Sequence, residues 1–302
     1  MKTALRQRVA ALGWFVLGAA AAAPAFAQDA GALRAAHEAL RDRLANNPFR
    51  RPLVLESTQS AASLRGDVYA IVDQPFTLVA PALQGMAHWC ELLILHLNVK
   101  HCSTAGQAPT EVLTLVVGRK FDQPLADGYK VAFAYSVPTA APDYLRVKMT
   151  AETGPLSTRD YQLAVEATPL DSGRSFIHLS YSYSYGMAAR LAMQGYLATL
   201  ARDKVGFSVV ADKGQDGKPV FVNGLRGVAE RNTMRYYLAV EAYLGARSAP
   251  PAEQLEKRLR DWFAATERHP LQLHEIERDA YLAMKRREVQ RQQVAGAAAK
   301  RP

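Results

Sequence analysis

Alternating apolar and polar positions mark the middle of the chain. The alternation is clearest in 131–137, 145–149, 161–167 and 176–186, where large apolar side chains occupy every second position. A period of two is typical of strands that bury one face and leave the other face wet. Residues 168–174 have the composition of a turn and join the last two segments directly. Short turns between successive strands favour an antiparallel meander over alternating β-α-β units.

Helical spacing of apolar residues appears on both sides of this region. Leucines in 29–46 fall on one stripe and predict a short amphipathic helix. A stronger helix is predicted over 223–244, with Asn223 as its N-cap. It is about 20 residues long, which is enough to lie along a whole sheet. An apolar helical segment over 187–200 and a hairpin over 204–222 separate this helix from the strands.

The first residues of the chain have the order of a secretory signal peptide. Three basic residues precede an apolar run over 10–22, and Ala25-Phe26-Ala27 supplies an A-x-A cleavage site. The alternative is an uncleaved membrane anchor, but an anchor needs roughly 20 apolar residues and lacks the small-residue exit. We therefore expect the mature chain to begin at Gln28 and to be a soluble periplasmic protein.

The net charge excludes little. The formal charge is +9 at neutral pH, and cleavage removes three basic residues and no acid, so the mature chain keeps six excess positive charges. Nucleic acid is an unsuitable partner outside the cytoplasm, and none is predicted. A moderate basic excess agrees either with peripheral contact with an anionic membrane surface or with no specific role.

Two cysteines, Cys90 and Cys102, lie close together in the sequence. In an oxidising compartment such a pair predicts a disulfide, which would contribute about 3 kcal/mol by closing so short a loop. A Cys/His metal site that also uses His88, His96 and His101 is the alternative. The spacing of these residues matches no zinc-finger or zincin pattern, so we predict no metal.

Motifs that carry common chemistry are absent from the sequence. It contains no phosphate-binding glycine loop, no G-x-S-x-G nucleophile elbow and no H-E-x-x-H. No cofactor and no catalytic residue is therefore predicted. His178 with Asp160 or Glu166 could form a base and its orienting acid across two strands. These residues share parity with the polar positions of both strands, and we interpret that side as a solvated outer face.

Phenol side chains are the strongest sign of a binding site. Tyr181, Tyr183 and Tyr185 alternate with serines and share parity with the apolar residues of their strand. A core that served only stability would favour aliphatic residues, because every buried hydroxyl needs a partner. The tyrosines therefore suggest an interior that is partly open to a ligand. A packed core whose phenols reach the rim of the sheet is the alternative. By the same alternation, Phe133, Tyr135 and Tyr161 also line inner faces.

Charged and polar residues near these elements were also considered for the site. Arg159 stands at the entry to a strand and is expected either to hold the polar end of a ligand or to form a plain salt bridge. The segment 230–235 is charged, and we interpret it as lying mainly on the wet side of the long helix. Asn232 lies on the apolar stripe of that helix and needs a hydrogen-bond partner if it is buried.

The order of elements resembles the helix-grip arrangement of the START-like superfamily, which includes lipid-transfer domains, the birch-pollen allergen family and bacterial polyketide cyclases. The resemblance covers roughly Leu64 to Gly245 and is carried by the element order with segments 66–76 and 224–232. It implies an α+β fold in which a curved antiparallel sheet grips the long helix around a cavity for sterols, lipids or aromatic polyketides. It also implies that Asn232 and Tyr236 on the apolar stripe join the inward tyrosines in the cavity wall. A minority of the superfamily are enzymes.

These observations give a domain layout and a function. The predicted parts are a signal peptide (1–27), an N-terminal helix and lead-in (28–63), a helix-grip domain (64–248), a C-terminal helical extension (249–293) and a disordered tail (294–302). The predicted function is a periplasmic binding or carrier protein for a hydrophobic or amphipathic small molecule, lipid-like or aromatic. The alternatives are an enzyme of cyclase or hydrolase type on the same scaffold, and an envelope interaction protein with a closed core.

Overall fold

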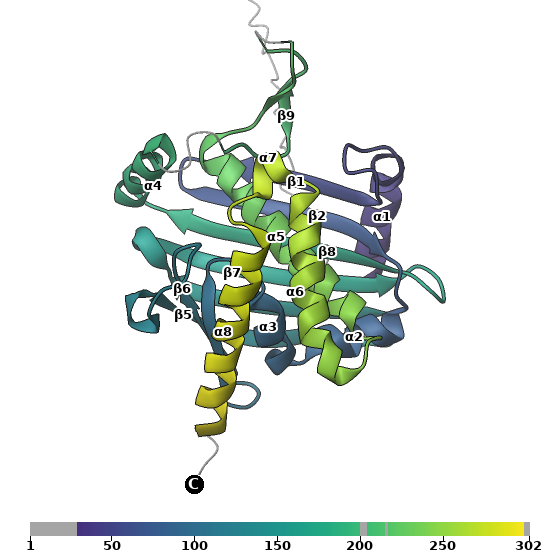
Figure 1. The fold of residues 1–302 in the computed structure, drawn as a ribbon. Coiled ribbons are helices and arrows are strands. Elements are labelled where there is room, and N and C mark those ends of the chain that lie inside the picture. The colour runs from purple at the N-terminus through teal and green to yellow at the C-terminus, as the bar shows by residue number, and fades with distance from the viewer. Residues whose placement is uncertain (1–28, 200–203, 215–216, 299–302) are drawn as a thin grey trace, which may run out of the picture.

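The protein is built around one large antiparallel sheet. The computed structural model describes residues 29–199, 204–214 and 217–298. The sheet has eight strands in the order β1-β2-β8-β7-β6-β5-β4-β3 (Figure 1). The strands are β1 (Leu53–Gln59), β2 (Ser63–Val72), β3 (Val99–Ala105), β4 (Val112–Val117), β5 (Tyr129–Ala141), β6 (Tyr144–Thr153), β7 (Thr158–Pro169) and β8 (Ser175–Tyr185). The predicted meander and α+β class are therefore confirmed.

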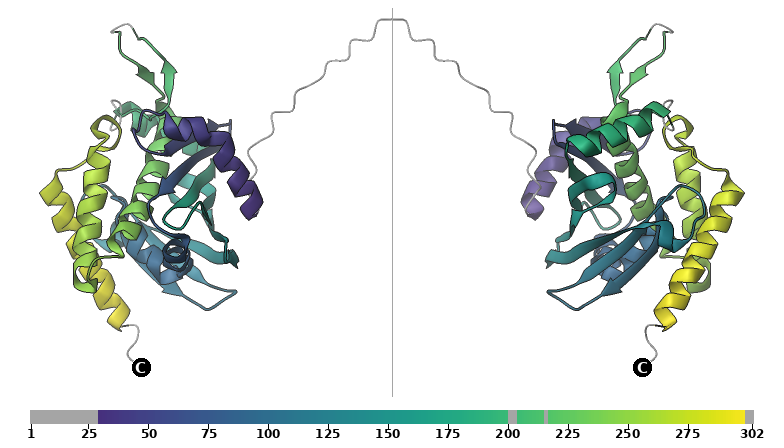
Figure 2. Two further views of the ribbon diagram at one scale, coloured as in Figure 1. Left: turned by 90° about the vertical axis from the view of Figure 1, so that its right-hand side faces the viewer. Right: turned by 90° about the vertical axis from the view of Figure 1, so that its left-hand side faces the viewer.

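Helices cover both faces of this sheet. The helices are α1 (Ala30–Ala45), α2 (Phe76–Gln84), α3 (Met86–Leu93), α4 (Met187–Thr199), α5 (Gly224–Ala246), α6 (Pro251–Glu267), α7 (Pro270–Leu273) and α8 (Arg278–Ala298). The long helix α5 packs on β1, β2 and β8, which is the predicted helix grip. Figure 2 shows the layers, with α1 on one side of the sheet, α5 on the other, and α6 and α8 outside α5. A short hairpin, β9 (Val209–Ala211) with β10 (Val220–Phe221), precedes α5.

The outer layer of helices changes the environment of α5. The charged segment 230–235 was expected to face water, but Glu230, Arg231 and Arg235 are all buried. Glu230 accepts hydrogen bonds from the backbone N–H of Ser208 at 2.9 Å, and the Trp262 indole donates to the carbonyl of Arg235 at 3.2 Å. The expectation was wrong because α6 and the segment before β9 cover the side of α5 that faces away from the sheet.

A smaller apolar cluster attaches α1 to the other face of the sheet. Its buried members are Leu33, Leu44, Val54, Tyr69, Tyr144 and Phe176. The polar side of β7 and β8 was interpreted as a solvated outer face, and that interpretation is also wrong. The helix α1 lies over this side and removes its centre from water.

The domain boundaries differ from the prediction at both ends. β1 belongs to the sheet, although residues 53–59 were predicted to be part of the lead-in segment. Three consecutive residues at the start of β1 are buried, because α1 covers one face and α5 the other, so no alternation marks this strand. At the other end α8 continues as helix to Ala298, where disorder was expected from residue 294. Alanine has the highest helix propensity, which explains this extension. The predicted signal peptide and residues 299–302 lie outside the described residues.

Cys90 on α3 and Cys102 on β3 form the predicted disulfide. Both sulfur atoms are used by this bond, so the alternative of a Cys/His metal site is not realised. In 29–199, 204–214 and 217–298, no group of three or more His, Cys, Asp or Glu side chains is placed to hold a metal ion. Across the same residues, no helix has both the length and the apolar character that a bilayer crossing requires.

At Gly66 the strand β2 lies close to α5. A Cβ atom at this position would collide with the hydroxyl of Thr233 and lie 3.0 Å from its Cβ. We expect Gly66→Ala to lower the free energy of unfolding by about 1–3 kcal/mol, because an extra methyl in a packed interface forces the elements apart. Urea denaturation would measure the change. Gly173→Ala is the control, since a Cβ there meets nothing closer than 3.8 Å. Equal denaturation midpoints for the two variants would contradict the assigned contact.

Candidate ligand-binding site

A cavity of about 270 Å³ lies between α5 and the sheet. Its walls come from β4, β5, β7 and β8, from α5, from the loop after α3, and from Met193 on α4. The apolar aliphatic lining residues are Leu115, Val117, Val131, Leu156, Leu225 and Val228, together with Met193. The volume lies just below the range of about 300–1,000 Å³ that small-molecule sites occupy.

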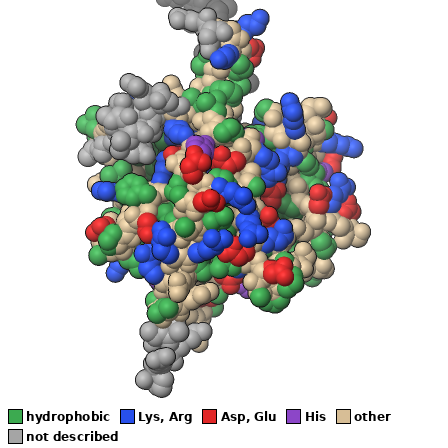
Figure 3. Space-filling view, viewed as in Figure 1, with side chains coloured by type: hydrophobic (Ala, Val, Ile, Leu, Met, Phe, Trp, Pro, Cys, Tyr) green, Lys and Arg blue, Asp and Glu red, His purple; other side chains and the backbone are tan. Residues whose placement is uncertain are grey.

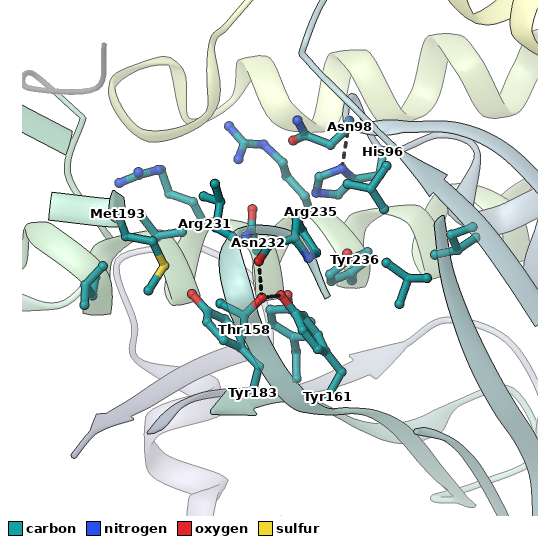
Figure 4. A pocket seen from close by; sticks show the side chains of 18 of the residues that line it. His96, Asn98, Thr158, Tyr161, Tyr183, Met193, Arg231, Asn232, Arg235 and Tyr236 are labelled. Carbon is teal, nitrogen blue, oxygen red and sulfur yellow. Dashed lines mark hydrogen bonds between the residues drawn. The ribbon is translucent and has the colours of Figure 1, made fainter. Parts of the chain in front are cut away.

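Aromatic rings form the sheet side of the cavity (Figure 4). Tyr161 on β7 stacks on Tyr183 of β8 with centroids 5.2 Å apart, and Phe133 of β5 meets Tyr161 edge-on at 6.4 Å. From the opposite side, Tyr236 of α5 approaches Tyr181 at 5.1 Å. Burial raises the pKa of the Tyr181, Tyr183 and Tyr236 phenols, so these rings stay neutral. The result is an uncharged aromatic surface with hydroxyl groups at its edges.

Six of the nine predicted cavity residues line this space. They are Phe133, Tyr161, Tyr181, Tyr183, Asn232 and Tyr236. Inward parity on β5, β7 and β8 explains the four strand residues, and the apolar stripe of α5 explains the other two. The tyrosines were expected to border an open interior or to be packed in the core. The structure shows both, since some of them border the cavity and others are packed.

The remaining three predicted residues lie elsewhere. The hydroxyls of Tyr135 and Tyr185 donate to the backbone carbonyls of Gln84 at 2.7 Å and Ser60 at 2.9 Å, so both are satisfied core residues. The Arg159 side chain is exposed and pairs with Asp160 at 3.2 Å, which is the plain salt bridge of the alternative reading. Asp160 has a φ of 54°, and the β7–β8 register shifts between Arg159 and Gln162. The prediction for Arg159 came from its place at the entry to a strand, and in the structure the side chain is exposed there.

The polar end of the cavity was not predicted from the sequence. It is formed by His96, Asn98 and Lys120 from loops and by Arg231 and Arg235 from α5. Lys120 and Arg235 share the carboxylate of Glu275, at 2.6 and 2.8 Å. Burial lowers the pKa of Lys120 to about 8. No periodic pattern could have found this group, because its members come from two loops and from a helix face expected to be wet.

His96 has a defined tautomer at this end. Its Nδ1 accepts the backbone N–H of Asn98 at 3.1 Å, so the neutral ring carries its proton on Nε2. Burial, followed by the nearby cations Arg235 and Lys285, holds the pKa of His96 well below its usual value. The ring stacks on Tyr236 with centroids 4.8 Å apart. His96 is therefore a neutral hydrogen-bond donor held in a fixed position.

The candidate base His178 lies on the opposite face of the sheet, beneath α1. Its Nδ1 is 2.9 Å from Glu166 and its Nε2 is 2.8 Å from Asp67, while Asp160 is not a partner. Arg65 donates to Asp67 at 2.7 Å, and the Tyr144 hydroxyl donates to Glu166. Burial alone would lower the pKa of His178, but the hydrogen bonds to both carboxylates outweigh it and raise the pKa. His178, Asp67 and Glu166 do not line the cavity. We therefore assign this cluster to stability.

The fold and the site define a helix-grip protein with an internal cavity that has aliphatic and aromatic walls. No protein-family model and no curated protein sequence matches the chain. Among solved structures, norcoclaurine synthase from Thalictrum flavum is similar at 14% identity and a TM-score of 0.34, over 48% of this chain and 93% of that one. An aromatase/cyclase from Streptomyces is similar at 14% identity and a TM-score of 0.32, over 46% of this chain and 86% of that one. A START superfamily protein from Mycobacterium smegmatis is similar at 12% identity and a TM-score of 0.31, over 47% of this chain and 93% of that one.

These similarities cover about half of the chain, and their identities and TM-scores are too low to transfer an activity. The helix-grip arrangement itself is established by the sheet order and by the position of α5 against β1, β2 and β8.

Proposed function

We propose that this protein is a periplasmic carrier that binds a hydrophobic or aromatic small molecule in the cavity beneath α5. The observation that carries the proposal is the aromatic wall, in which five rings from three strands and one helix border the same space. Apolar surface buried against such a wall contributes about 25 cal/mol per Å² to binding. The hydroxyl groups and Asn232 at its edges orient the bound molecule.

Export is part of this proposal and has separate support. The first residues have the order of a cleaved signal peptide. Both cysteines are joined in a disulfide, which fits an oxidising compartment.

Contact with an anionic membrane surface stays a prediction from the net charge. On the face shown in Figure 3, basic side chains are interspersed with acidic ones rather than gathered in one patch. Ion pairs such as Arg286 with Glu256 at 2.7 Å and Arg287 with Asp122 at 3.0 Å account for part of this mixing. Sedimentation with vesicles that contain anionic lipid would test the contact.

Native mass spectrometry of protein purified gently from the periplasm tests the binding function. We expect a mature chain that begins at Gln28 and carries a stoichiometric apolar adduct, which organic extraction then identifies. Tyr183→Ala is expected to reduce retention of the adduct by about tenfold, because stacking and apolar burial are lost. Tyr129→Ala is the control, since Tyr129 is exposed on β5 and does not line the cavity. Full retention by Tyr183→Ala at unchanged stability would remove the aromatic wall from the site.

An enzyme of cyclase or hydrolase type is the second candidate. One observation favours it, namely that His96 and Lys120 bring titratable groups to the cavity, with the pKa of Lys120 lowered to about 8 by burial. Incubating the extracted compound with the purified protein would separate the candidates, since a carrier returns it unchanged. The third possibility, a closed-core interaction protein, is opposed by the presence of the cavity.

A further inference from the structure

The cavity has one strongly cationic end. Among the lining residues that the structure describes, three are cations, namely Lys120, Arg231 and Arg235, and none is Asp or Glu. Figure 4 shows Arg231 and Arg235 on the side opposite the phenols of Tyr161 and Tyr183. The space therefore has an aromatic wall on one side and positive charge on the other.

These cations are deeply buried rather than part of a solvated rim. Arg231 is 4% exposed and Arg235 2% exposed. Burying a cation is unfavourable unless an anion or hydrogen-bond acceptors compensate it. Glu275 compensates Lys120 and Arg235 together, and Arg231 donates to the carbonyl of Val205 at 3.0 Å. The described lining of this end thus holds three cations and no carboxylate, and the carboxylate of Glu275 behind it is shared by two of them.

His96 gives an independent indication at the same end. The side chain is 2% exposed, and its Nε2 has no hydrogen-bond partner. Because Nδ1 already accepts the Asn98 N–H, Nε2 is a donor that needs an acceptor. Leaving such a donor buried without a partner is costly. An acceptor supplied by a bound molecule would satisfy it.

We propose that the ligand of this cavity is a small amphiphilic acid, with its carboxylate at the end formed by His96, Lys120 and Arg231 and its apolar body over the aromatic wall. This inference rests on the proposed binding function and adds the chemical class of the ligand. The carboxylate accepts the Nε2–H of His96 and the charged donors, while the rings cover the body. A cavity of about 270 Å³ suits a molecule with one chain or one or two rings rather than a two-chain lipid.

Competition against a neutral fluorescent dye tests the inference. The mature protein is loaded with N-phenyl-1-naphthylamine at neutral pH, and decanoate, decanol and decylammonium are titrated as competitors of equal chain length. We expect decanoate to displace the dye at a concentration about tenfold lower than decanol, since charge-assisted hydrogen bonds are the stronger ones. Decylammonium is expected to be the weakest competitor.

Two variants connect the preference to the cationic end. Lys120→Met is expected to lower decanoate affinity about tenfold and leave decanol unchanged, while Arg235 keeps its pair with Glu275. His96→Phe keeps the stack on Tyr236 and removes the Nε2 donor, so it serves as the second variant. The control is Arg41→Gln, which removes a cation from the exposed side of α1, away from the cavity.

The outcomes distinguish failure of the acid assignment from failure of the proposed binding function. Equal displacement by decanoate and decanol, or a preference for decylammonium, would overturn the acid assignment and leave cavity binding intact. Failure of the dye and of all three competitors to bind would overturn the proposed function itself. A decanoate preference that both cavity variants retain would place the acid at another site and so reject this one.

Discussion

Replacing His178 with leucine is expected to lower the free energy of unfolding by about 3–5 kcal/mol, because removing one member of a buried charged cluster leaves the others without compensation. Asp67 and Glu166 are 3% and 0% exposed and both bond to the imidazole. Urea denaturation followed by circular dichroism measures the loss.

A second histidine provides the matched control for this variant. His274 also contacts two carboxylates, Glu267 at 2.9 Å and Glu277 at 3.8 Å, but its side chain is 39% exposed. His274→Leu should therefore change the free energy of unfolding by less than about 1 kcal/mol. A loss for His178→Leu no larger than for His274→Leu would show that burial does not govern the cluster.

The pH dependence of the His178 effect follows from two shifts of opposite sign. Burial would raise the pKa of Asp67, but hydrogen bonds to His178 and Arg65 lower it to about 2. Its contribution is present above the unfolded value of about 3.9 and is lost as pH falls. The pKa of His178 is raised, so its contribution is complete below about 6.5 and is lost as pH rises through the folded value. The stability difference between wild type and His178→Leu should be largest between these limits. A difference that is constant with pH would contradict the charged pairing.

The second large effect is expected at Glu288 on α8. This carboxylate pairs with Lys100 of β3 at 3.1 Å and with Lys285 at 2.7 Å, and all three side chains are fully buried. Glu288→Gln leaves two buried cations without a counter-charge, so we expect a loss of about 3–5 kcal/mol in the free energy of unfolding. Glu256→Gln is the control, because Glu256 pairs with Arg286 between α6 and α8 at the surface.

Alkaline pH should reduce the loss caused by Glu288→Gln. Burial lowers the pKa of Lys285 to about 8, below its unfolded value of about 10.4. The charged lysine is thus unfavourable in the folded state, and stability rises as the pH passes from the folded to the unfolded value. Once the lysines are neutral, they no longer need the carboxylate. Urea midpoints of wild type and variant at neutral and alkaline pH should converge, and a gap that widens would refute this account.

The fold could be predicted where one face of a strand is buried and the other is wet. Residues 145–149 show this alternation and form the first half of β6. The prediction missed β1, because α1 and α5 cover both of its faces and leave no period of two to detect. Coverage by a third layer is also why Glu230 and Arg235 were placed in water. The spacing of apolar and charged residues within α5 cannot show that a later helix, α6, packs against its charged side.

The part of the candidate site that lies on the strands could be predicted from the alternation of inward and outward residues. Tyr161, Tyr181 and Tyr183 point inward as alternation requires, and they line the cavity. Arg159 was predicted from its place at a strand entry, and there its side chain is exposed and pairs with Asp160. His96 and Lys120 lie outside regular strands, and only the tertiary fold brings them to Arg231.

The buried partnership of α8 with β3 has a consequence for the order of folding. Lys100 and Glu288 are 188 residues apart, and Lys285 reaches back 189 residues to the carbonyl of His96. Contacts of such long sequence separation form slowly. During synthesis, a nascent chain without α8 lacks two contacts. Lys100 has no Glu288 to pair with, and the carbonyl of His96 has no Lys285 to bond. The cavity end of the sheet can therefore become native only after nearly the whole polypeptide is made.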